Sequence, residues 1–145
     1  MVYDRRNSAS YLAAQLAKGF TRALQQRVIA LGFSAGQFPI LLELWSEDGL
    51  TQRQLLARID VEQATMANTL ARMERDGLIE RRVHPSDKRA QLVHLTEKAR
   101  EVERQAIAAA VAAEEALLGG FRRFERELLL EYIRQAIDNG RDLKG

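Results

Sequence analysis

The sequence predicts a mainly α-helical fold that contains one small β-hairpin. Apolar residues recur at helical spacing along most of the 145 residues, and this period fails only between residues 78 and 95, where two short strand-like runs flank a turn. A hydrophobic content of 46% and a charged content of 29% are ordinary for a folded globular protein. The length suits a single domain, residues 1–145, and a compact monomer of this size would expose about 7,500 Å².

The first predicted helix begins near Ser8 or Ser10 and ends before Gly32. One apolar face repeats every four positions, at Leu12, Leu16, Phe20, Leu24 and Val28. A glycine directly after the last periodic residue is a common helix terminator because it adopts the left-handed conformation without a steric penalty.

The second predicted helix runs to about Ser46. Ser34 and Gln37 form the sequence pattern of a capping box, in which each side chain satisfies a free backbone N–H at the helix start. Pro39 fits the interior of this helix poorly because it lacks an N–H, so the helix is expected to begin later than the cap suggests. Residues 47–49 then form a turn.

Two short helices follow in close succession. Thr51 and Gln54 repeat the capping-box pattern and open a helix through Ile59. The next helix extends from Gln63 to Asp76, with Met66, Leu70 and Met73 on one side, and Gly77 ends it. This spacing is typical of a helix-turn-helix, whose second helix can enter the major groove of DNA.

A β-hairpin follows the helix pair at once. Its strands are predicted at Ile79–Val83 and Gln91–Leu95, on either side of the turn formers at 84–87. Lys88 and Arg89 lie at its tip. A helix pair followed by a basic hairpin is the pattern of a winged helix-turn-helix, in which the hairpin, residues 78–95, is the wing.

Two helices complete the chain. Thr96 caps a long helix to about Leu118, Gly119 and Gly120 break it, and a last helix starts near Phe124 and reaches at least Ala136. The winged lobe, residues 34–96, cannot cover all of the apolar residues in this part of the chain, which include Leu117, Leu118, Phe121, Phe124, Leu128, Leu129, Tyr132 and Ile133. A twofold dimer would bury them through helices at 8–31 and 97–145, and a monomeric bundle folded back on the wing is the alternative.

The outer face of the second short helix carries base-reading chemistry. Thr65, Asn68, Thr69 and Arg72 fall within roughly 100° of one another on a helix. Asn can pair with adenine and Arg with guanine in the major groove. An ordinary solvated face is also polar, but no Asp or Glu occurs from Gln63 to Met73, which favours contact with phosphate-rich DNA.

The charges of the chain are unevenly distributed. The net charge is only +2, but the wing strands and turn contain Arg81, Arg82, Lys88 and Arg89 against Glu80 and Asp87. We expect Arg89 to enter a narrow minor groove and Asp87 to stabilise the wing tip by local hydrogen bonds or an ion pair. The residues expected to bind DNA are Thr51, Arg53, Gln63, Thr65, Asn68, Thr69, Arg72, Ser86, Lys88 and Arg89.

Other classes of function receive little support. The chain has no cysteine, so thiol chemistry and disulfides are excluded. Both histidines, His84 and His94, lie in the hairpin without a recognisable catalytic motif or carboxylate partners for a metal, so we expect no enzyme, metal site or cofactor. No run of about 18 uncharged apolar residues occurs, which predicts no membrane association and a cytoplasmic location.

Three motifs make the chain resemble the MarR family of transcription regulators. Residues 87–96 read DKRAQLVHLT, which is similar to the family wing pattern D-x-R-x-x-x-x-x-L-T. Residues 70–81 read LARMERDGLIER and residues 31–38 read LGFSAGQF, in the order and spacing of the family.

The resemblance implies a fold of six helices and a winged hairpin, and a homodimer intertwined through its terminal helices that binds palindromic double-stranded DNA. It places the recognition helix at Gln63–Asp76 and the wing arginine at Arg89. Many relatives release DNA when a small, often phenolic, molecule binds, so a repressor released by such an effector is expected, although no effector-binding residue is assigned. The alternative is a winged-helix scaffold for protein interactions without specific DNA binding.

Overall fold

The computed structural model describes residues 2–143. In chain order its α-helices, 3₁₀ helices (η) and strands are η1 (Arg5–Asn7), α1 (Ala9–Val28), η2 (Ile29–Leu31), η3 (Ala35–Gln37), α2 (Phe38–Ser46), β1 (Leu50–Thr51), α3 (Gln52–Arg58), α4 (Gln63–Arg75), β2 (Ile79–Val83), β3 (Gln91–Leu95), α5 (Glu97–Glu101), α6 (Glu103–Leu118) and α7 (Arg123–Arg141). The predicted mainly helical fold with a small β-hairpin wing is confirmed.

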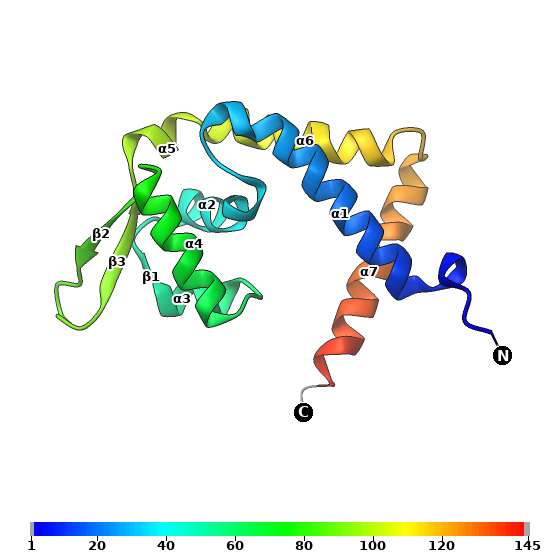
Figure 1. The fold of residues 1–145 in the computed structure, drawn as a ribbon, viewed down its shortest axis with the longest axis horizontal. Coiled ribbons are helices and arrows are strands. Elements are labelled where there is room, and N and C mark those ends of the chain that lie inside the picture. Colours follow the sequence, from blue (N-terminus) through cyan, green and yellow to red (C-terminus); the bar gives the residue numbers. More distant parts are fainter. Residues whose placement is uncertain (1, 144–145) are drawn as a thin grey trace.

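The molecule is elongated and has two regions (Figure 1). One is the lobe, residues 34–96, with α2, α3, α4 and the strands. The other is the arm, formed by α1, α6 and α7. The wing projects at the end of the molecule opposite the arm, so α7 does not fold back on the wing.

A three-stranded antiparallel sheet of order β1-β3-β2 supports the wing. Ile79 pairs with Leu95 and Val83 with Gln91, so the two hairpin strands have the predicted bounds. The short strand β1 was not predicted, because two residues are too few to show an alternating pattern. It pairs Leu50 with Val93 and joins the sheet to the start of α3.

The lobe encloses its own apolar core. Each lobe helix contributes the apolar side of its sequence pattern, and the fully buried side chains include Leu41, Leu44, Leu55, Met66, Leu70, Met73 and Val93. Three aromatic rings pack at its edge, with the centroids of Phe38 and Trp45 6.1 Å apart and Phe33 stacked on Phe38. The indole N–H of Trp45 donates to the carbonyl of Ala99 at 3.0 Å, which ties α2 to α5.

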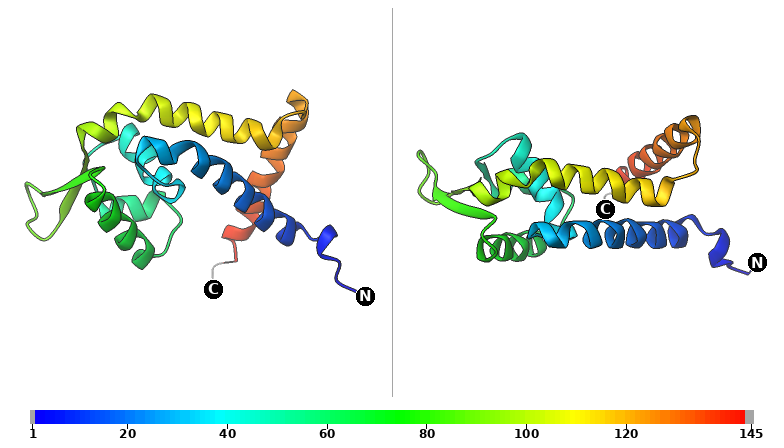
Figure 2. Two further views of the ribbon diagram at one scale, coloured as in Figure 1. Left: turned by 45° about the horizontal axis from the view of Figure 1, so that its top comes forward. Right: turned by 90° about the horizontal axis from the view of Figure 1, so that it is seen from above.

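In the arm, α1 and α6 lie side by side in both views of Figure 2. They approach closely because Gly19 has no side chain, and a Cβ there would lie 3.1 Å from Leu117. Within Arg123–Arg141 no residue is buried. Of the apolar residues predicted to need a partner, Leu118 is buried, Leu117 and Leu129 are half-buried, and the exposed ones are Phe121, Phe124, Leu128, Tyr132 and Ile133.

Two predicted helices have different bounds in the structure. The α-helix after Ser34 begins at Phe38, because a 3₁₀ turn takes residues 35–37 and Pro39 occupies the first turn, where its missing N–H costs no hydrogen bond. The single helix predicted from Thr96 to Leu118 is wrong: it is broken at Val102 into α5 and α6. Ala99 and Ala106, on either side of the break, are both fully buried in the same apolar core.

No single helix among residues 2–143 has the length and apolar character needed to cross a membrane, although the bent pair Ala9–Leu31 and Ala35–Ser46 together passes that test.

Candidate nucleic-acid interface

Helix α4 is oriented by its buried side. Met66, Leu70 and Met73 are at most 1% exposed and fix this side against the core. The opposite side must therefore face outward, and Gln63, Thr65, Asn68 and Arg72 are all exposed there. Thr69 is half-buried, and its hydroxyl donates to the carbonyl of Thr65 at 2.8 Å.

The preceding helix α3 is fixed at its first turn by a capping box. The backbone N–H of Gln54 donates to the Thr51 hydroxyl at 3.1 Å, and the backbone N–H of Thr51 donates to the Gln54 side chain at 2.8 Å. Thr51 therefore holds the start of α3 as well as lying at the predicted interface. Arg53, in the first turn, is exposed.

The tip of the wing presents Arg89 to solvent. Its side chain is 94% exposed, and Asp87 accepts hydrogen bonds from its backbone N–H at 3.0 Å and from its Nε at 3.4 Å. The backbone N–H of Ser86 donates to Nδ1 of His84 at 3.0 Å, which closes the turn on its other side. Asp87 thus holds the tip in shape while the guanidinium of Arg89 stays at the surface.

A cleft of 540 Å³ separates the wing from the start of α3. It brings together four of the predicted DNA-binding residues, Thr51, Arg53, Lys88 and Arg89. Gln63, Thr65, Asn68, Thr69 and Arg72 lie outside it on α4, and Ser86 lies outside it at the wing tip. The interface therefore has two parts, a helix face and a basic cleft.

The cleft also contains two basic residues that sequence analysis did not select as DNA-binding, Arg81 and His84. Arg81 is on the same side of β2 as the buried Ile79; its side chain is 24% exposed, and its Nε lies 3.8 Å from a carboxylate oxygen of Glu74. The alternation of β2 was the available signal, because it places residues 79, 81 and 83 on one side.

Acidic side chains border this surface. Asp60 and Glu62 are exposed directly before α4, and Asp87 is the acidic residue in the cleft. The helix face from Gln63 to Met73 carries none. The acidic residues directly before α4 therefore mark one edge of the surface that could approach a polyanion.

A second cavity, of 400 Å³, lies where the arm meets the lobe. Its lining is mostly apolar and comes from α1, α2, α6 and α7, with Phe20 and Phe38 among the aromatic residues. Arg126 and Glu114 supply polar groups. Arg126 is already engaged, because its Nη2 donates to Glu115 at 2.7 Å and to the carbonyl of Leu118 at 2.9 Å.

Comparison with known proteins gives a consistent result. The sequence model described as "MarR family" matches residues 33–90. The transcriptional regulator HosA of Escherichia coli O111:H- is 29% identical over 133 residues, which cover 92% of this chain and 97% of HosA.

Solved structures of similar fold include regulators with bound partners. The PcaV transcriptional regulator of Streptomyces coelicolor, in complex with its natural ligand, superposes with a TM-score of 0.81 at 23% identity and covers 95% of this chain and 97% of its own. A MarR family regulator from Listeria monocytogenes, complexed with a 26mer DNA, gives a TM-score of 0.77 at 20% identity and covers 96% and 89%.

Proposed function

We propose that this chain, whose residues 33–90 are a MarR-family domain, is a transcription regulator that binds specific sequences of double-stranded DNA through α4 and the wing. The observation that carries the proposal is the exposed face of α4, where Thr65, Asn68 and Arg72 point outward and no acidic residue occurs. Arg, Asn and Thr are the side chains that read base edges in the major groove. The complex of the Listeria regulator with DNA supports this use of the fold.

In the complex, α4 lies in the major groove and the wing contacts the adjacent backbone and minor groove. The exposed Arg89 reaches the minor groove, where the potential is most negative. Thr51, Arg53 and Lys88 contact phosphates, which position the protein without reading sequence. Arg81 and His84 extend this basic surface into the cleft.

The active form is a homodimer joined by the arm, through helices at 8–31 and 97–145. The chain exposes 10,647 Å², against about 7,500 Å² expected for a compact protein of this size. The exposed apolar residues of α7 account for part of the excess. A stable interface needs about 800 Å² from each partner.

A twofold dimer presents two copies of α4 to one duplex. Their separation then matches one turn of DNA, so the binding site is palindromic. Each half-site is read by one lobe.

A small organic effector, of the phenolic type, releases the protein from its operator, which makes the protein a repressor. The 400 Å³ cavity supports this part of the proposal, since it is mostly apolar, contains polar groups and joins the arm to the lobe. The ligand complex of PcaV is a case of a similar fold binding a small molecule.

The second candidate function is a scaffold for protein interactions, in which the basic wing is merely solvated. Salt dependence separates the two. A dimer with about six phosphate contacts loses roughly a thousandfold in affinity for a duplex between 50 and 200 mM salt, because bound counterions are released on binding. Fluorescence anisotropy with a labelled duplex measures this, and binding that is absent at low salt or unchanged with salt would favour the scaffold.

A further inference from the structure

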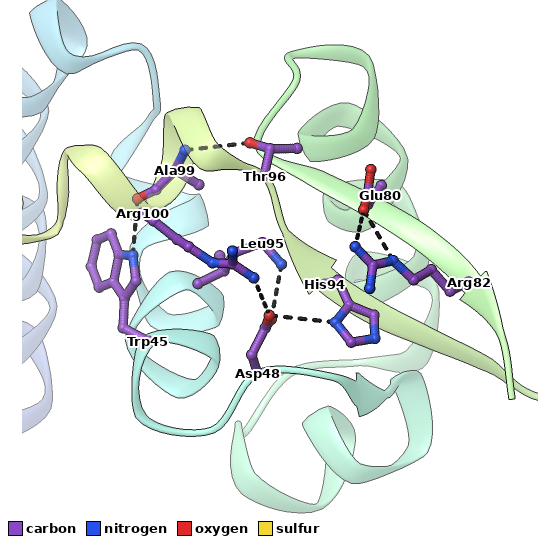
Figure 3. A network of polar contacts seen from close by, with 9 residues as sticks. All are labelled: Trp45, Asp48, Glu80, Arg82, His94, Leu95, Thr96, Ala99 and Arg100. Atoms are coloured by element: carbon purple, nitrogen blue, oxygen red, sulfur yellow. Dashed lines mark hydrogen bonds and ion pairs between the residues drawn. The ribbon is translucent and has the colours of Figure 1, made fainter. Parts of the chain in front are cut away.

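An acidic residue lies at the base of the wing and contacts two elements, β3 and α5 (Figure 3). Asp48 belongs to the turn between α2 and β1. One carboxylate oxygen accepts a hydrogen bond from the backbone N–H of Leu95, at the end of β3, at 2.8 Å. The other lies 2.9 Å from Nη2 of Arg100, in α5, and 3.4 Å from Nδ1 of His94.

The turn that carries Asp48 is docked tightly on β3. The backbone N–H of Gly49 donates to the carbonyl of Val93 at 3.1 Å. Gly49 has a φ of +76°, and a Cβ at this position would lie 2.9 Å from the ring of His94. Both the conformation and the close approach require glycine, so the position of Asp48 relative to the wing is fixed by the backbone.

The wing base is held from the other side as well. The hydroxyl of Thr96 donates to the carbonyl of Gly77 at 2.6 Å, and the backbone N–H of Thr96 donates to the carbonyl of Leu78 at 3.1 Å. Beyond these contacts the hairpin extends away from the core, and Val83 is 63% exposed. The direction of the wing therefore depends on how its base is held.

The negative charge of Asp48 is unfavourable in a lobe that is proposed to bind DNA. A carboxylate in a lobe that binds DNA repels phosphate, so removal of the charge alone would strengthen binding. Its side chain is 27% exposed and engaged on both oxygens. Its contacts instead hold the base of the wing in position.

We propose that Asp48 is a positioning residue that sets the direction of the wing relative to α4, so that Arg89 reaches DNA when α4 is in the groove. This inference rests on the proposed function. Asp48 touches no DNA in this scheme and acts through Leu95 and its neighbours in β3.

The test compares Asp48→Asn with Glu47→Gln. Both substitutions remove one negative charge from the same turn, but Glu47 pairs with Arg58 of α3 and does not contact the wing. Affinity is measured by anisotropy on a mixed-sequence duplex of about 30 base pairs, long enough for two half-sites one helical turn apart. Asp48→Asn is expected to weaken binding about fivefold, and Asp48→Ala about tenfold, whereas Glu47→Gln leaves it unchanged or stronger.

A double-mutant cycle with Arg89 tests whether Asp48 changes DNA affinity through the contact that Arg89 makes. In the Arg89→Ala background the tip contact is already lost, so Asp48→Ala is expected to change affinity less than about twofold. A full, additive loss in that background overturns the proposal, as does a stronger affinity for Asp48→Asn than for the unsubstituted protein.

If Asp48→Ala does not fold, amide exchange of Leu95 in Asp48→Asn, followed by NMR, still tests the proposal. In the unsubstituted protein this N–H is expected to be protected, and Asp48→Asn is expected to make it exchange faster while amides of the α4 core stay protected. No change at Leu95 overturns the proposal. An absence of duplex binding by the unsubstituted protein would instead refute the proposed function, and the two failures are therefore distinguishable.

Discussion

The lobe and the arm differ in how much of their apolar surface is buried within one chain. The lobe packs α2, α3, α4 and the sheet around a closed core, and Leu41, Leu55 and Leu70 are fully buried within one chain. In the arm, α7 has no buried residue, although its sequence is as clearly amphipathic as that of α4. The lobe thus encloses its core in one chain, whereas the exposed apolar side of α7 supports the proposed packing of the arm against a second copy.

The largest effect is expected from a substitution that places a charge on the apolar surface of the arm. Leu128→Arg puts an unpaired cation on the exposed apolar side of α7. The change occurs twice in a twofold dimer, and burial of an unpaired charge costs several kcal/mol, so the dimer dissociation constant is expected to rise about a thousandfold or more. Sedimentation measures it.

The matched control on α7 is Glu127→Arg, which breaks only an exposed ion pair with Arg123. It is expected to leave the dimer intact. If Leu128→Arg behaves like this control, the apolar side of α7 is not the interface.

The next largest effect is expected in the lobe core. Leu70→Ala removes a fully buried side chain and leaves a cavity, so the free energy of unfolding should fall by about 2–5 kcal/mol. Leu42→Ala in the same lobe, at a side chain that is 39% exposed, should cost less than about 1 kcal/mol. Denaturant unfolding of both variants checks this, and equal losses would show that the lobe core is not closed.

A smaller effect is expected to distinguish the two parts of the proposed DNA interface. Asn68→Ala is expected to reduce the preference for a selected duplex over random DNA by about 1–3 kcal/mol, because a base contact is lost. Arg89→Ala should weaken binding to both duplexes while folding and dimerisation stay intact, since the side chain is exposed. Competition anisotropy measures both, and an equal loss on both duplexes for Asn68→Ala would make Asn68 a phosphate contact.

The smallest expected effect is a dependence of stability on pH. Partial burial raises the pKa of Asp48, but hydrogen bonds from Leu95, Arg100, Gly49 and His94 outweigh it and hold this pKa below its ordinary value. A lowered folded-state pKa stabilises the protein above the unfolded pKa of about 3.9, and this contribution is lost as the pH falls through the folded-state pKa. Thermal unfolding between neutral and acidic pH should therefore show a loss that Asp48→Asn lacks, and identical curves would contradict the hydrogen-bonded role of Asp48.

Much of the fold follows from local pattern. The caps at Thr51 and Thr96 and the left-handed Gly77 place helix ends within a residue or two, because each satisfies the free backbone groups of its helix end locally. The break at Val102 is different, since the residues on both sides of it favour a helix and no local signal marks it. The strand β1 likewise exists only because β3 pairs with it.

The candidate site was predictable to a similar degree. Helical periodicity was sufficient to place Thr65, Asn68 and Arg72 on the outer face of α4. The cleft lined by Arg53 and Arg81 depends on the orientation of the wing relative to α3, and no local sequence pattern indicates that orientation. Asp48 was missed for the same reason, because its partners lie 46 to 52 residues away in the sequence.

The most direct test of the division into lobe and arm is the mass of the complex with DNA. Sedimentation of the protein with a duplex of about 30 base pairs at low salt reports how many chains each duplex binds. The account predicts two chains per duplex, bound as one dimer that already exists without DNA. A free protein that is monomeric, or a complex that contains a single chain, would contradict it.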